Sequence, residues 1–539
     1  MTSLSDQLQH AFALQQRGNH AESISVLKKL LKTFPKEAQV PWLIGVAYLH
    51  EKDLTRSENY LKKARKLKHD DANVLNSLGM LKLEQKDYRA AYEFFSAAYA
   101  SQANDISLLG NLSLAASGMG EFELAISHAK EAYTLSGNHQ LQAFKYANAL
   151  SGADHFNEAI NVLKEVTQAS PRYLEAWMNL GNNLKIKGRF EEAKKAYESA
   201  LKLDEHNAGV KFNLGLLLLR EAESARGWQL YEARRELVEF QDKNLQKLNA
   251  PYWQGEDLTG KTLLIYSEQG RGDTLHYCRY LAWVKARGAA TIVLYGDPKM
   301  QRLFNSLLGL DEWVNEGDKL PKHHYRVSIM SLPSIYFSLA DTHRFMHPYL
   351  SASDESVTYW RDYFARRGQE TATTNQKRLR VGIVWQGNPG FLWDRYRSIP
   401  LVELSPIIED ETLDIISVQV FDPTKQLASF KRVSPHLAAR IDDPTDSIRR
   451  RGAYYDDTAG LLSQLDAVIT TDTSMTHLCG ALGVKTFLLQ GAYSDWRYGT
   501  DEKQVPDYPS MSLCREDDWH HWSSAVHKAH GELRAMRSA

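Results

Sequence analysis

A 34-residue period runs through residues 4–207 and limits what this part of the chain can fold into. Successive windows begin at residues 4, 38, 72, 106, 140 and 174 and place small residues at equal offsets. Three offsets are shared in this way. One is held by Gly45, Gly79 and Gly181, a second by Ala91, Ala125, Ala159 and Ala193, and a third by Ala64, Ala98, Ala132 and Ala200. Small residues at fixed offsets let two antiparallel helices approach closely where they cross. The pattern therefore predicts an α-solenoid of stacked helix pairs.

The window at residues 174–207 carries the pattern most fully, with Trp177, Leu180, Gly181, Gly188, Ala193, Tyr197 and Ala200. It resembles the tetratricopeptide repeat, and the resemblance covers the six windows of residues 4–207. Asn111, Asn179 and Asn213 share one offset on the first helix of their windows. Such amides could bind the backbone of an extended peptide in the concave groove of the solenoid; alternatively, they are surface asparagines without a ligand.

After Tyr252 the period disappears, and strand-like apolar runs alternate with helical patterns. The runs are residues 263–266, 291–296, 327–332, 380–389, 414–420, 465–471 and 485–491. This alternation predicts parallel sheets in two α/β lobes, with a ligand cleft between them. The expected divisions are six repeats (4–207), a degenerate seventh repeat with junction helices (208–250), a first Rossmann-like lobe (251–368), a linker (369–379), a second Rossmann-like lobe (380–516) and a C-terminal helix (517–539).

Composition excludes several classes of protein. The net charge of −1 gives no general electrostatic reason to bind nucleic acid or anionic membranes. Cys278, Cys479 and Cys514 lack the spacing of a disulfide framework or a zinc site. The N-terminal residues lack the pattern of a secretory signal, and we find no apolar run near the ~20 residues that span a bilayer. We therefore expect a cytoplasmic protein with no membrane span and no nucleic-acid partner.

The first lobe opens with a strand, a glycine turn and a helix-like pattern, which is how α/β proteins build sites at the carboxyl edge of a sheet. The turn contains Glu268, Gly270, Gly272, Asp273 and Thr274. Leu275 stands where a dinucleotide-binding fingerprint needs its third glycine, which argues against a nicotinamide-dependent enzyme. The Asp273 carboxylate is expected to face the ligand in the crevice.

Three segments of the second lobe suit an anionic ligand. The residues concerned are Gln386, Asn388, Arg395, Arg397 and Ser398 after one strand, Asp472, Thr473, Thr476, His477 and Gly480 after another, and Trp496 and Arg497 after a third. Arginines at a strand end favour phosphate or carboxylate, and an anion at a helix start gains roughly 0.3–2 kcal/mol. The alternatives are an arginine–aspartate network that pins a loop, a structural His477 and a Trp496 packed in the core.

Taken together, the motifs EQGRGDTLHYCRYL, VGIVWQGNP, DRYRSIPL, DTSMTHLCGALG and DWRYG resemble bacterial tetratricopeptide-repeat proteins with a heptosyltransferase-like glycosyltransferase domain. The resemblance includes the junction residues Gly227, Trp228, Tyr231, Glu232 and Arg234. It implies a GT-B fold that needs no metal or other cofactor, with the acceptor side in the first lobe and the nucleotide-sugar side in the second. It also implies that Asp273 is the general base and that Asp472, Thr473, Thr476, His477 and Gly480 hold the donor diphosphate. Residues 384–401 depart from the heptosyltransferase signature, so the donor nucleotide stays open.

The architecture also resembles bacterial flagellin glycosyltransferases and, more distantly, O-GlcNAc transferases. These resemblances imply an inverting transfer of a sugar to Ser or Thr of a protein acceptor, possibly flagellin, which the repeats would hold. Because a helix N-terminus favours the charged carboxylate, it weakens Asp273 as a base. Two alternatives are a non-catalytic adaptor and a lipopolysaccharide heptosyltransferase, although the latter leaves the repeats without a role.

Overall fold

The computed structural model describes residues 3–240, 249–371, 378–391, 393–491, 494–500, 504–516 and 521–538. Most of the expected linker (residues 372–377) and parts of the expected junction (241–248) and C-terminal helix (517–520 and 539) lie outside the described residues. The chain divides into two compact units, Met1–Glu205 and His206–Ala539. Each unit is described separately below.

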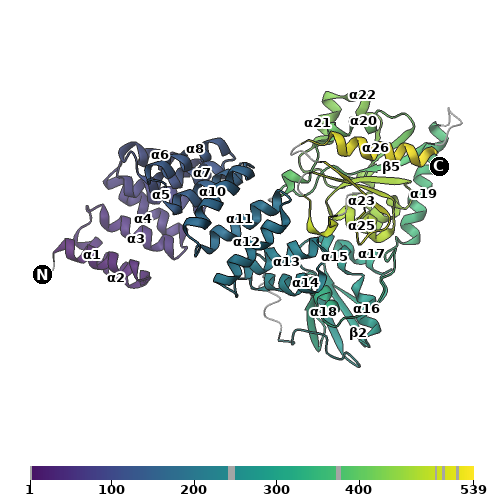
Figure 1. Ribbon diagram of the computed structural model, residues 1–539, viewed down its shortest axis with the longest axis horizontal. Coiled ribbons are helices and arrows are strands. Elements are labelled where there is room, and N and C mark those ends of the chain that lie inside the picture. The colour runs from purple at the N-terminus through teal and green to yellow at the C-terminus, as the bar shows by residue number, and fades with distance from the viewer. Residues whose placement is uncertain are drawn as a thin grey trace. The chain divides into compact units, whose positions relative to one another are not determined.

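The first unit consists of consecutive antiparallel helix pairs (Figure 1, purple to blue). Its helices are α1 (Leu4–Gln16), α2 (His20–Thr33), α3 (Gln39–His50), α4 (Leu54–Leu67), α5 (Ala72–Glu84), α6 (Tyr88–Ser101), α7 (Ile106–Gly118), α8 (Phe122–Leu135), α9 (Gln140–Gly152), α10 (Phe156–Ala169), α11 (Leu174–Ile186) and α12 (Phe190–Leu203). The first helix of each pair contacts the first helix of the next pair. This stacking confirms the predicted repeat solenoid.

The repeated glycines mark where a large side chain of the second helix meets the first helix. A Cβ atom on Gly79 would lie 2.5 Å from the Phe95 ring, and one on Gly181 would lie 2.5 Å from the Tyr197 ring. Gly45 has the same relation to Leu61, at 2.7 Å. Since these distances are shorter than van der Waals contact, only glycine fits, and the shared offset follows from packing.

The second unit opens with another helix pair, α13 (Ala208–Arg220) and α14 (Ser224–Tyr231). The short 3₁₀ turns η1 (Glu232–Glu236) and η2 (Val238–Phe240) follow. Trp228 and Tyr231 are buried in the same apolar core as the first sheet. The helices expected to cap the solenoid are therefore also part of the α/β unit.

In the described residues, the first sheet has four parallel strands in the order β3-β2-β1-β4. The strands are β1 (Thr262–Tyr266), β2 (Thr291–Gly296), β3 (Glu312–Asn315) and β4 (Tyr325–Ser328). The helices that accompany them are α15 (Arg271–Tyr277), α16 (Tyr280–Ala286), α17 (Gln301–Phe304), α18 (Leu332–Ser338) and α19 (Asp354–Thr371). The strand β3 was not among the predicted runs.

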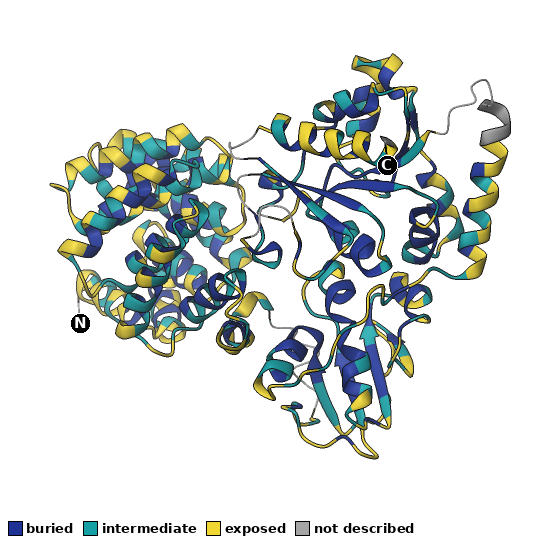
Figure 2. Cartoon of the chain, turned by 45° about the vertical axis from the view of Figure 1, so that its right-hand side comes forward, coloured by how far each residue is buried: buried dark blue, intermediate teal, exposed yellow. Residues whose placement is uncertain are grey.

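The second sheet has six parallel strands within the described ranges, in the order β10-β9-β8-β5-β6-β7. They are β5 (Leu379–Ile383), β6 (Leu413–Ser417), β7 (Ile441–Asp442), β8 (Ala467–Thr471), β9 (Thr486–Gln490) and β10 (Met511–Arg515). The helices between them are α20 (Ser405–Ile408), α21 (Gln426–Val433), α22 (Pro435–Ala438), α23 (Thr445–Arg451), α24 (Tyr454–Leu462) and α25 (Ser474–Leu482). Every residue of β8 and β9 is buried, as the dark blue strands of Figure 2 illustrate. The two parallel sheets confirm the predicted α/β class.

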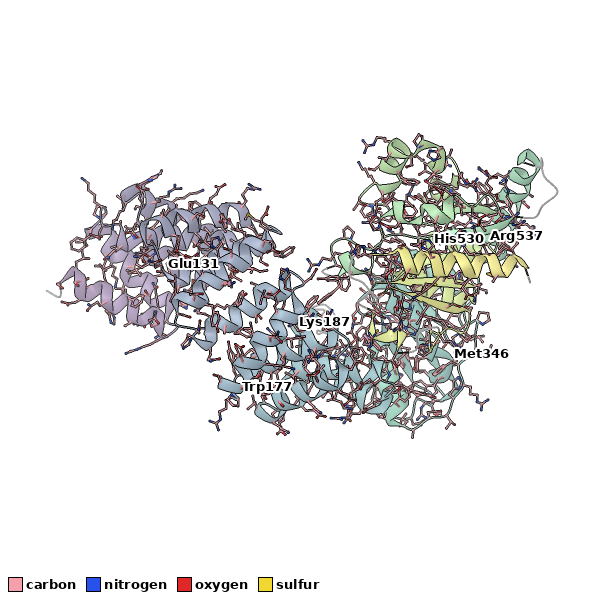
Figure 3. All side chains as sticks on the ribbon, turned by 45° about the horizontal axis from the view of Figure 1, so that its top comes forward. Glu131, Trp177, Lys187, Met346, His530 and Arg537 are labelled. Carbon is pink, nitrogen blue, oxygen red and sulfur yellow. The ribbon has the colours of Figure 1, made fainter. Side chains whose placement is uncertain are left out.

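The last helix, α26 (Ser523–Ser538), packs against β9 and β10 of the second sheet. Its Ala525, Val526, Ala529 and Leu533 are buried in the core of that sheet. His530, labelled on this helix in Figure 3, lies with Nε2 2.8 Å from Oδ2 of Asp410. The helix is thus an integral layer of the second sheet.

Candidate functional site

Two helices that follow carboxyl ends of strands meet between the two sheets. The helix α15 begins shortly after β1, and α25 begins shortly after β8. A Cβ atom on Gly272 would lie 2.8 Å from Cδ2 of His477 and 3.4 Å from Cα of Ser474. Gly272 is therefore required for this close approach, which brings the two predicted motifs into one site.

Asp273 is held from both sides of this meeting point. The Gly270 amide donates to its Oδ2 at 2.9 Å, and Nη2 of Arg497 donates to its Oδ1 at 2.5 Å. Burial raises the pKa of Asp273, while the charge of Arg497 acts in the opposite direction. Arg497 also pairs through Nη1 with Oδ1 of Asp495 at 2.9 Å, so one guanidinium bridges two carboxylates.

Asp472 lies at the start of α25 and interacts with Tyr498, whose hydroxyl donates to its Oδ1 at 2.6 Å. Burial, reinforced by the charge of Asp495, raises the pKa of Asp472 to about 6. The N-cap is Thr473, which accepts a hydrogen bond from the Met475 amide at 3.2 Å. Asp472 is therefore a half-buried carboxylate beside the helix start, and Thr473 takes the capping role.

Several buried polar atoms near the carboxyl edge of the second sheet have no hydrogen-bond partner within the described residues. They include Oγ1 of Thr471, Nε2 of Gln490 and Nε of Arg497. Thr471 ends β8 and Gln490 ends its neighbour β9. Because buried polar groups are nearly always paired, these atoms are suited to a polar ligand or to solvent at this edge.

Gln386 forms the centre of an amide cluster beyond β5. It is 5% exposed, and its Oε1 accepts from Oγ1 of Thr424 at 2.6 Å and from Nε2 of Gln426 at 3.3 Å. Its main-chain amide donates to Oε1 of Gln419 at 3.0 Å. Sequence reasoning missed Gln419, Thr424 and Gln426. The polar residues after the run 414–420 were a signal for Thr424 and Gln426, whereas Gln419 lay inside the run itself.

The loop that carries Arg397 is pinned by Asp394, as one sequence alternative proposed. Nε of Arg397 donates to Oδ1 of Asp394 at 3.0 Å, and the hydroxyl of Ser398 donates to its Oδ2 at 2.9 Å. Even so, Arg397 lies close enough to Asp472 for its charge to lower the pKa of that carboxyl group. The guanidinium is therefore both a loop anchor and part of the site.

Arg395 and Asn388, also predicted to bind the donor, make local contacts in this loop. Arg395 is exposed, with its guanidinium 4.6 Å from the ring centroid of Tyr396. Asn388 accepts the Gly390 amide at 3.0 Å in a local turn. Neither contact connects these two side chains to Asp273 or Asp472.

On the first-lobe side, Glu268 is engaged by the protein itself. Both of its carboxylate oxygens accept hydrogen bonds from Arg234, at 2.8 and 2.9 Å. Thr274 is buried at 1% exposure. Glu268 and Thr274, predicted to face an acceptor, therefore pack into the protein, and Glu268 links the glycine turn to the junction.

His477 lies in a buried polar cluster between the two lobes. Its ring stacks on that of His276, with centroids 4.9 Å apart, and its Nδ1 is 3.0 Å from the Tyr508 hydroxyl. Asp507 links to this cluster through Nε2 of His276 at 2.9 Å and through Nη2 of Arg279 at 2.8 Å. Burial lowers the pKa of His276 to about 4 and that of His477 well below its usual value. These contacts match the structural alternative for His477.

Two other predicted residues pack closely in the protein interior. Gly480 lies directly under the Tyr508 ring, where no Cβ atom would fit. The Trp496 ring meets that of Trp228 edge-on, with centroids 5.5 Å apart, and lies 5.9 Å from that of Tyr231. These contacts match the core-packing alternative for Trp496.

In the first unit, the predicted asparagines pair across neighbouring first helices. Asn111 on α7 donates to Asn76 on α5 at 2.9 Å, and Asn179 on α11 donates to Asn148 on α9 at 2.8 Å. In the second unit, Asn213 donates to the carbonyl of Gly209 at 3.0 Å within its own helix. The amides thus also bond within the protein, which the peptide-ladder interpretation did not include.

The first helices of the solenoid also expose apolar side chains at one shared offset of the repeat. Phe12 is 48% exposed, Met80 is 36% exposed and Leu114 is 61% exposed. Sequence reasoning did not single out these residues, because an apolar residue in a helix pattern is usually assigned to the core.

The described residues contain neither a metal site nor a membrane-spanning helix. No group of three or more His, Cys, Asp or Glu side chains among them could hold a metal ion. Among the helices of the described ranges, none is both long and apolar enough to cross a membrane.

Comparison with known proteins identifies the repeats. Family models described as "Tetratricopeptide repeat" match residues 8–72 and 174–207. A curated relative, Protein FlbA of Caulobacter vibrioides, is 23% identical over 391 residues, which cover 64% of this chain and 59% of that protein. The alignment thus spans less than two thirds of the relative.

Solved structures resemble the chain weakly. PilF of Pseudomonas aeruginosa is 20% identical with a TM-score of 0.34, covering 38% of this chain and 94% of that one. A tetratricopeptide repeat protein of Parabacteroides merdae is 12% identical with a TM-score of 0.39, covering 45% and 95%. The likenesses to both are too low to support an argument. The conclusion is that the chain contains tetratricopeptide repeats and has a distant relative in FlbA.

Proposed function

We propose that this chain is a GT-B glycosyltransferase that moves a sugar from a nucleotide-sugar donor to a Ser or Thr hydroxyl of a protein. The observation that carries the proposal is the close approach of Gly272 to the start of α25, with the neighbouring Asp273 paired to Arg497 of the second lobe. A carboxylate of one lobe then lies next to a helix start of the other, which suits a base near a phosphate site.

The reaction would invert the anomeric carbon in a single displacement. The acceptor hydroxyl oxygen forms a bond to the anomeric carbon while the bond from that carbon to the donor phosphate oxygen breaks. The hydroxyl proton passes to Asp273, and the nucleoside diphosphate leaves with the bonding electrons. The raised pKa of Asp273 favours its role as a proton acceptor, because burial makes the protonated form less costly.

Arg497 supplies the charge that such a displacement needs. In the structure its single positive charge is shared between Asp273 and Asp495. A diphosphate leaving group would compete for the same guanidinium, which stabilises the developing negative charge and releases Asp273 to accept a proton. Arg397 adds a second positive charge near Asp472.

The donor would bind along the carboxyl edge of the second sheet. The unpaired Thr471 and Gln490 atoms and the amide cluster around Gln386 provide hydrogen-bonding groups for a polar ligand. The resemblance that implies a diphosphate at Thr473 and Thr476 is compatible with this edge. We propose that this nucleotide sugar is a substrate and that the reaction uses no cofactor.

The repeats would bind the acceptor in the cytoplasm. Exposed Phe12, Met80 and Leu114 lie on the same set of first helices as the paired asparagines. This surface offers apolar and amide contacts to an extended polypeptide. The resemblance to flagellin glycosyltransferases makes flagellin the first acceptor to test.

One observation favours a second candidate, a non-catalytic adaptor. Asp273 and Arg397 are both engaged by side chains of the protein itself. In an adaptor these contacts would be permanent, and the α/β unit would serve only as a scaffold for the repeats.

A panel of nucleotide sugars separates the two candidates. Each donor is added to the full chain, and thermal unfolding and release of nucleoside diphosphate are measured. A glycosyltransferase would be stabilised by one donor and would release its nucleotide, because a ligand that binds the native state raises stability. Asp273→Asn should lower the rate of release by about 10²–10⁴-fold, the contribution of a general base, whereas Asp410→Asn, which removes a carboxylate that pairs with His530 of α26, should retain it. Unchanged release by Asp273→Asn would reject the assignment of the base.

A further inference from the structure

The junction between the repeats and the first sheet contacts the turn that carries Asp273. Arg234, on η1, is fully buried and forms a two-bond ion pair with Glu268 at 2.8 and 2.9 Å. Its remaining donors reach Oε1 of Glu232 at 2.7 Å and Oγ of Ser331 at 2.7 Å. A buried arginine is costly unless each donor is satisfied, so this geometry fixes Glu268 tightly.

The next residue of the turn is held as well. Gln269 donates from Nε2 to the Tyr231 hydroxyl at 2.7 Å. Its φ angle of 64° lies in the left-handed region, which a residue with a side chain adopts at a cost. An external contact is therefore needed to keep the turn in this conformation. Gly270 follows at once and donates its amide to Asp273.

The same junction also contacts the segment that carries Arg497. The Trp228 and Tyr231 rings pack on Trp496, which precedes Arg497 in the chain. Nη1 of Arg220, on α13, donates to the carbonyl of Ser494 at 2.7 Å. The two members of the Asp273–Arg497 ion pair come from different sheets, but α13, α14 and η1 contact the segments of both.

We infer that Tyr231 and Arg234 are positioning residues for Asp273, and that the junction sets the separation between this carboxylate and Arg497. The junction thus adds a second connection between the two segments beside the direct contact of α15 with α25. The helix pair α13 and α14, predicted to be a degenerate seventh repeat, is thus a structural part of the site. The catalytic meaning of this inference rests on the proposed transferase function, whereas its structural meaning does not.

Hydrogen exchange tests the structural part. Tyr231→Phe removes only the hydroxyl and keeps the ring packing. Tyr363→Phe is the matched control, because Tyr363 donates a comparable bond to Asp442 at 2.9 Å, away from the turn. In the full chain at neutral pH, amides of residues 267–274 should exchange about fivefold faster in Tyr231→Phe, the effect of losing one hydrogen bond. The control should leave them unchanged. Equal protection of these amides in wild type and Tyr231→Phe would overturn the inference.

Activity tests the positioning role. Once a donor is found, Tyr231→Phe should lower kcat about fivefold and leave donor Kd unchanged, since the hydroxyl acts through Asp273. In an Asp273→Asn background the same change should cost nothing further. An equal loss in both backgrounds would mean that Tyr231 does not act through Asp273. If no donor is turned over, the transferase proposal fails, and the exchange experiment still decides the structural inference.

Discussion

Oδ1 of Asp273 and Nη2 of Arg497 lie 2.5 Å apart, joining the turn after β1 to the segment after β9. The two side chains are only 15% and 11% exposed, so water screens their attraction weakly. The energetic and chemical behaviour of the lobe interface depends strongly on this pair.

Breaking the pair from the arginine side should be costly. Arg497→Gln leaves the half-buried Asp273 and Asp495 without an ion-pair partner, and we expect a loss of about 2–4 kcal/mol in the free energy of unfolding at pH 7. Adding Asp273→Asn should restore about 1–2 kcal/mol of the free energy of unfolding, because it removes one carboxylate that has lost its ion-pair partner. Denaturant titration measures both.

An ion pair with an exposed arginine provides the control for that experiment. Arg534 pairs with Asp410 while its side chain is 67% exposed, so Arg534→Gln should change stability by less than about 1 kcal/mol. Equal losses for Arg497→Gln and Arg534→Gln would show that burial does not strengthen the Asp273–Arg497 pair.

The stacked histidines predict a loss of stability in acid. The folded-state pKa of His276 is lowered to about 4, whereas the unfolded value is about 6.5, so the unfolded chain binds more protons between these values. Stability should therefore be complete above pH 6.5 and fall as the pH drops towards 4, by about 2 kcal/mol for His276 alone at pH 5. His477, whose pKa is also lowered, acts in the same direction.

Urea midpoints between pH 7.5 and pH 5 measure this effect. His276→Asn should flatten the dependence, and replacement of the exposed His436 in the same unit should not. The raised pKa values of Asp472 and Asp273 act in the opposite direction, so the test is the comparison between the two proteins. An equal pH dependence in wild type and His276→Asn would contradict the lowered pKa of His276.

The close approach of the starts of α15 and α25 predicts that one added methyl group lowers stability. Gly272→Ala would place Cβ 2.8 Å from the His477 ring, which should cost about 1–3 kcal/mol and weaken donor binding. The helical Gly531 has no neighbour within 4 Å of such a Cβ, so Gly531→Ala should be neutral or stabilising by up to about 1 kcal/mol. Thermal unfolding of both variants tests this, and equal stability would reject the tight packing.

Neighbouring threonines should respond in opposite ways. Oγ1 of Thr471 is buried without a partner in the described residues, so Thr471→Val should hold or raise stability while it lowers affinity for the donor. Thr476 donates to the Thr471 carbonyl at 2.8 Å, so Thr476→Val should cost about 1 kcal/mol or more. Unfolding and donor titration distinguish the two. Unchanged donor affinity in Thr471→Val would remove this hydroxyl from the donor site.

The sequence predicted the repeats well, because their period reflects contacts between residues close in the chain. Gly79 meets Phe95 and Gly181 meets Tyr197 over one helix hairpin each. The buried central strands were also predictable from their apolar runs. The strands β3, β7 and β10 were not: β7 has only two residues, and the sequences of β3 (EWVN) and β10 (MSLCR) mix polar and apolar residues.

The sequence identified individual residues of the site but not the contacts between them. Asp273 and Arg497 were each identified, but they are 224 positions apart, and local patterns do not predict that they pair. The internal bonds of Glu268 and His477 were hidden for the same reason, since they depend on Arg234, His276 and Tyr508. Tertiary packing determines which polar side chains remain available for a ligand.

The buried face of α26 has a consequence for biosynthesis. The core of the second sheet includes Ala525, Val526, Ala529 and Leu533, so it cannot close before these residues have left the ribosome. The helix pairs of the solenoid contact mainly their neighbours and can form as they emerge. During translation, the repeats are therefore folded while β9 and β10 still lack their cover and depend on the remaining synthesis for protection from aggregation.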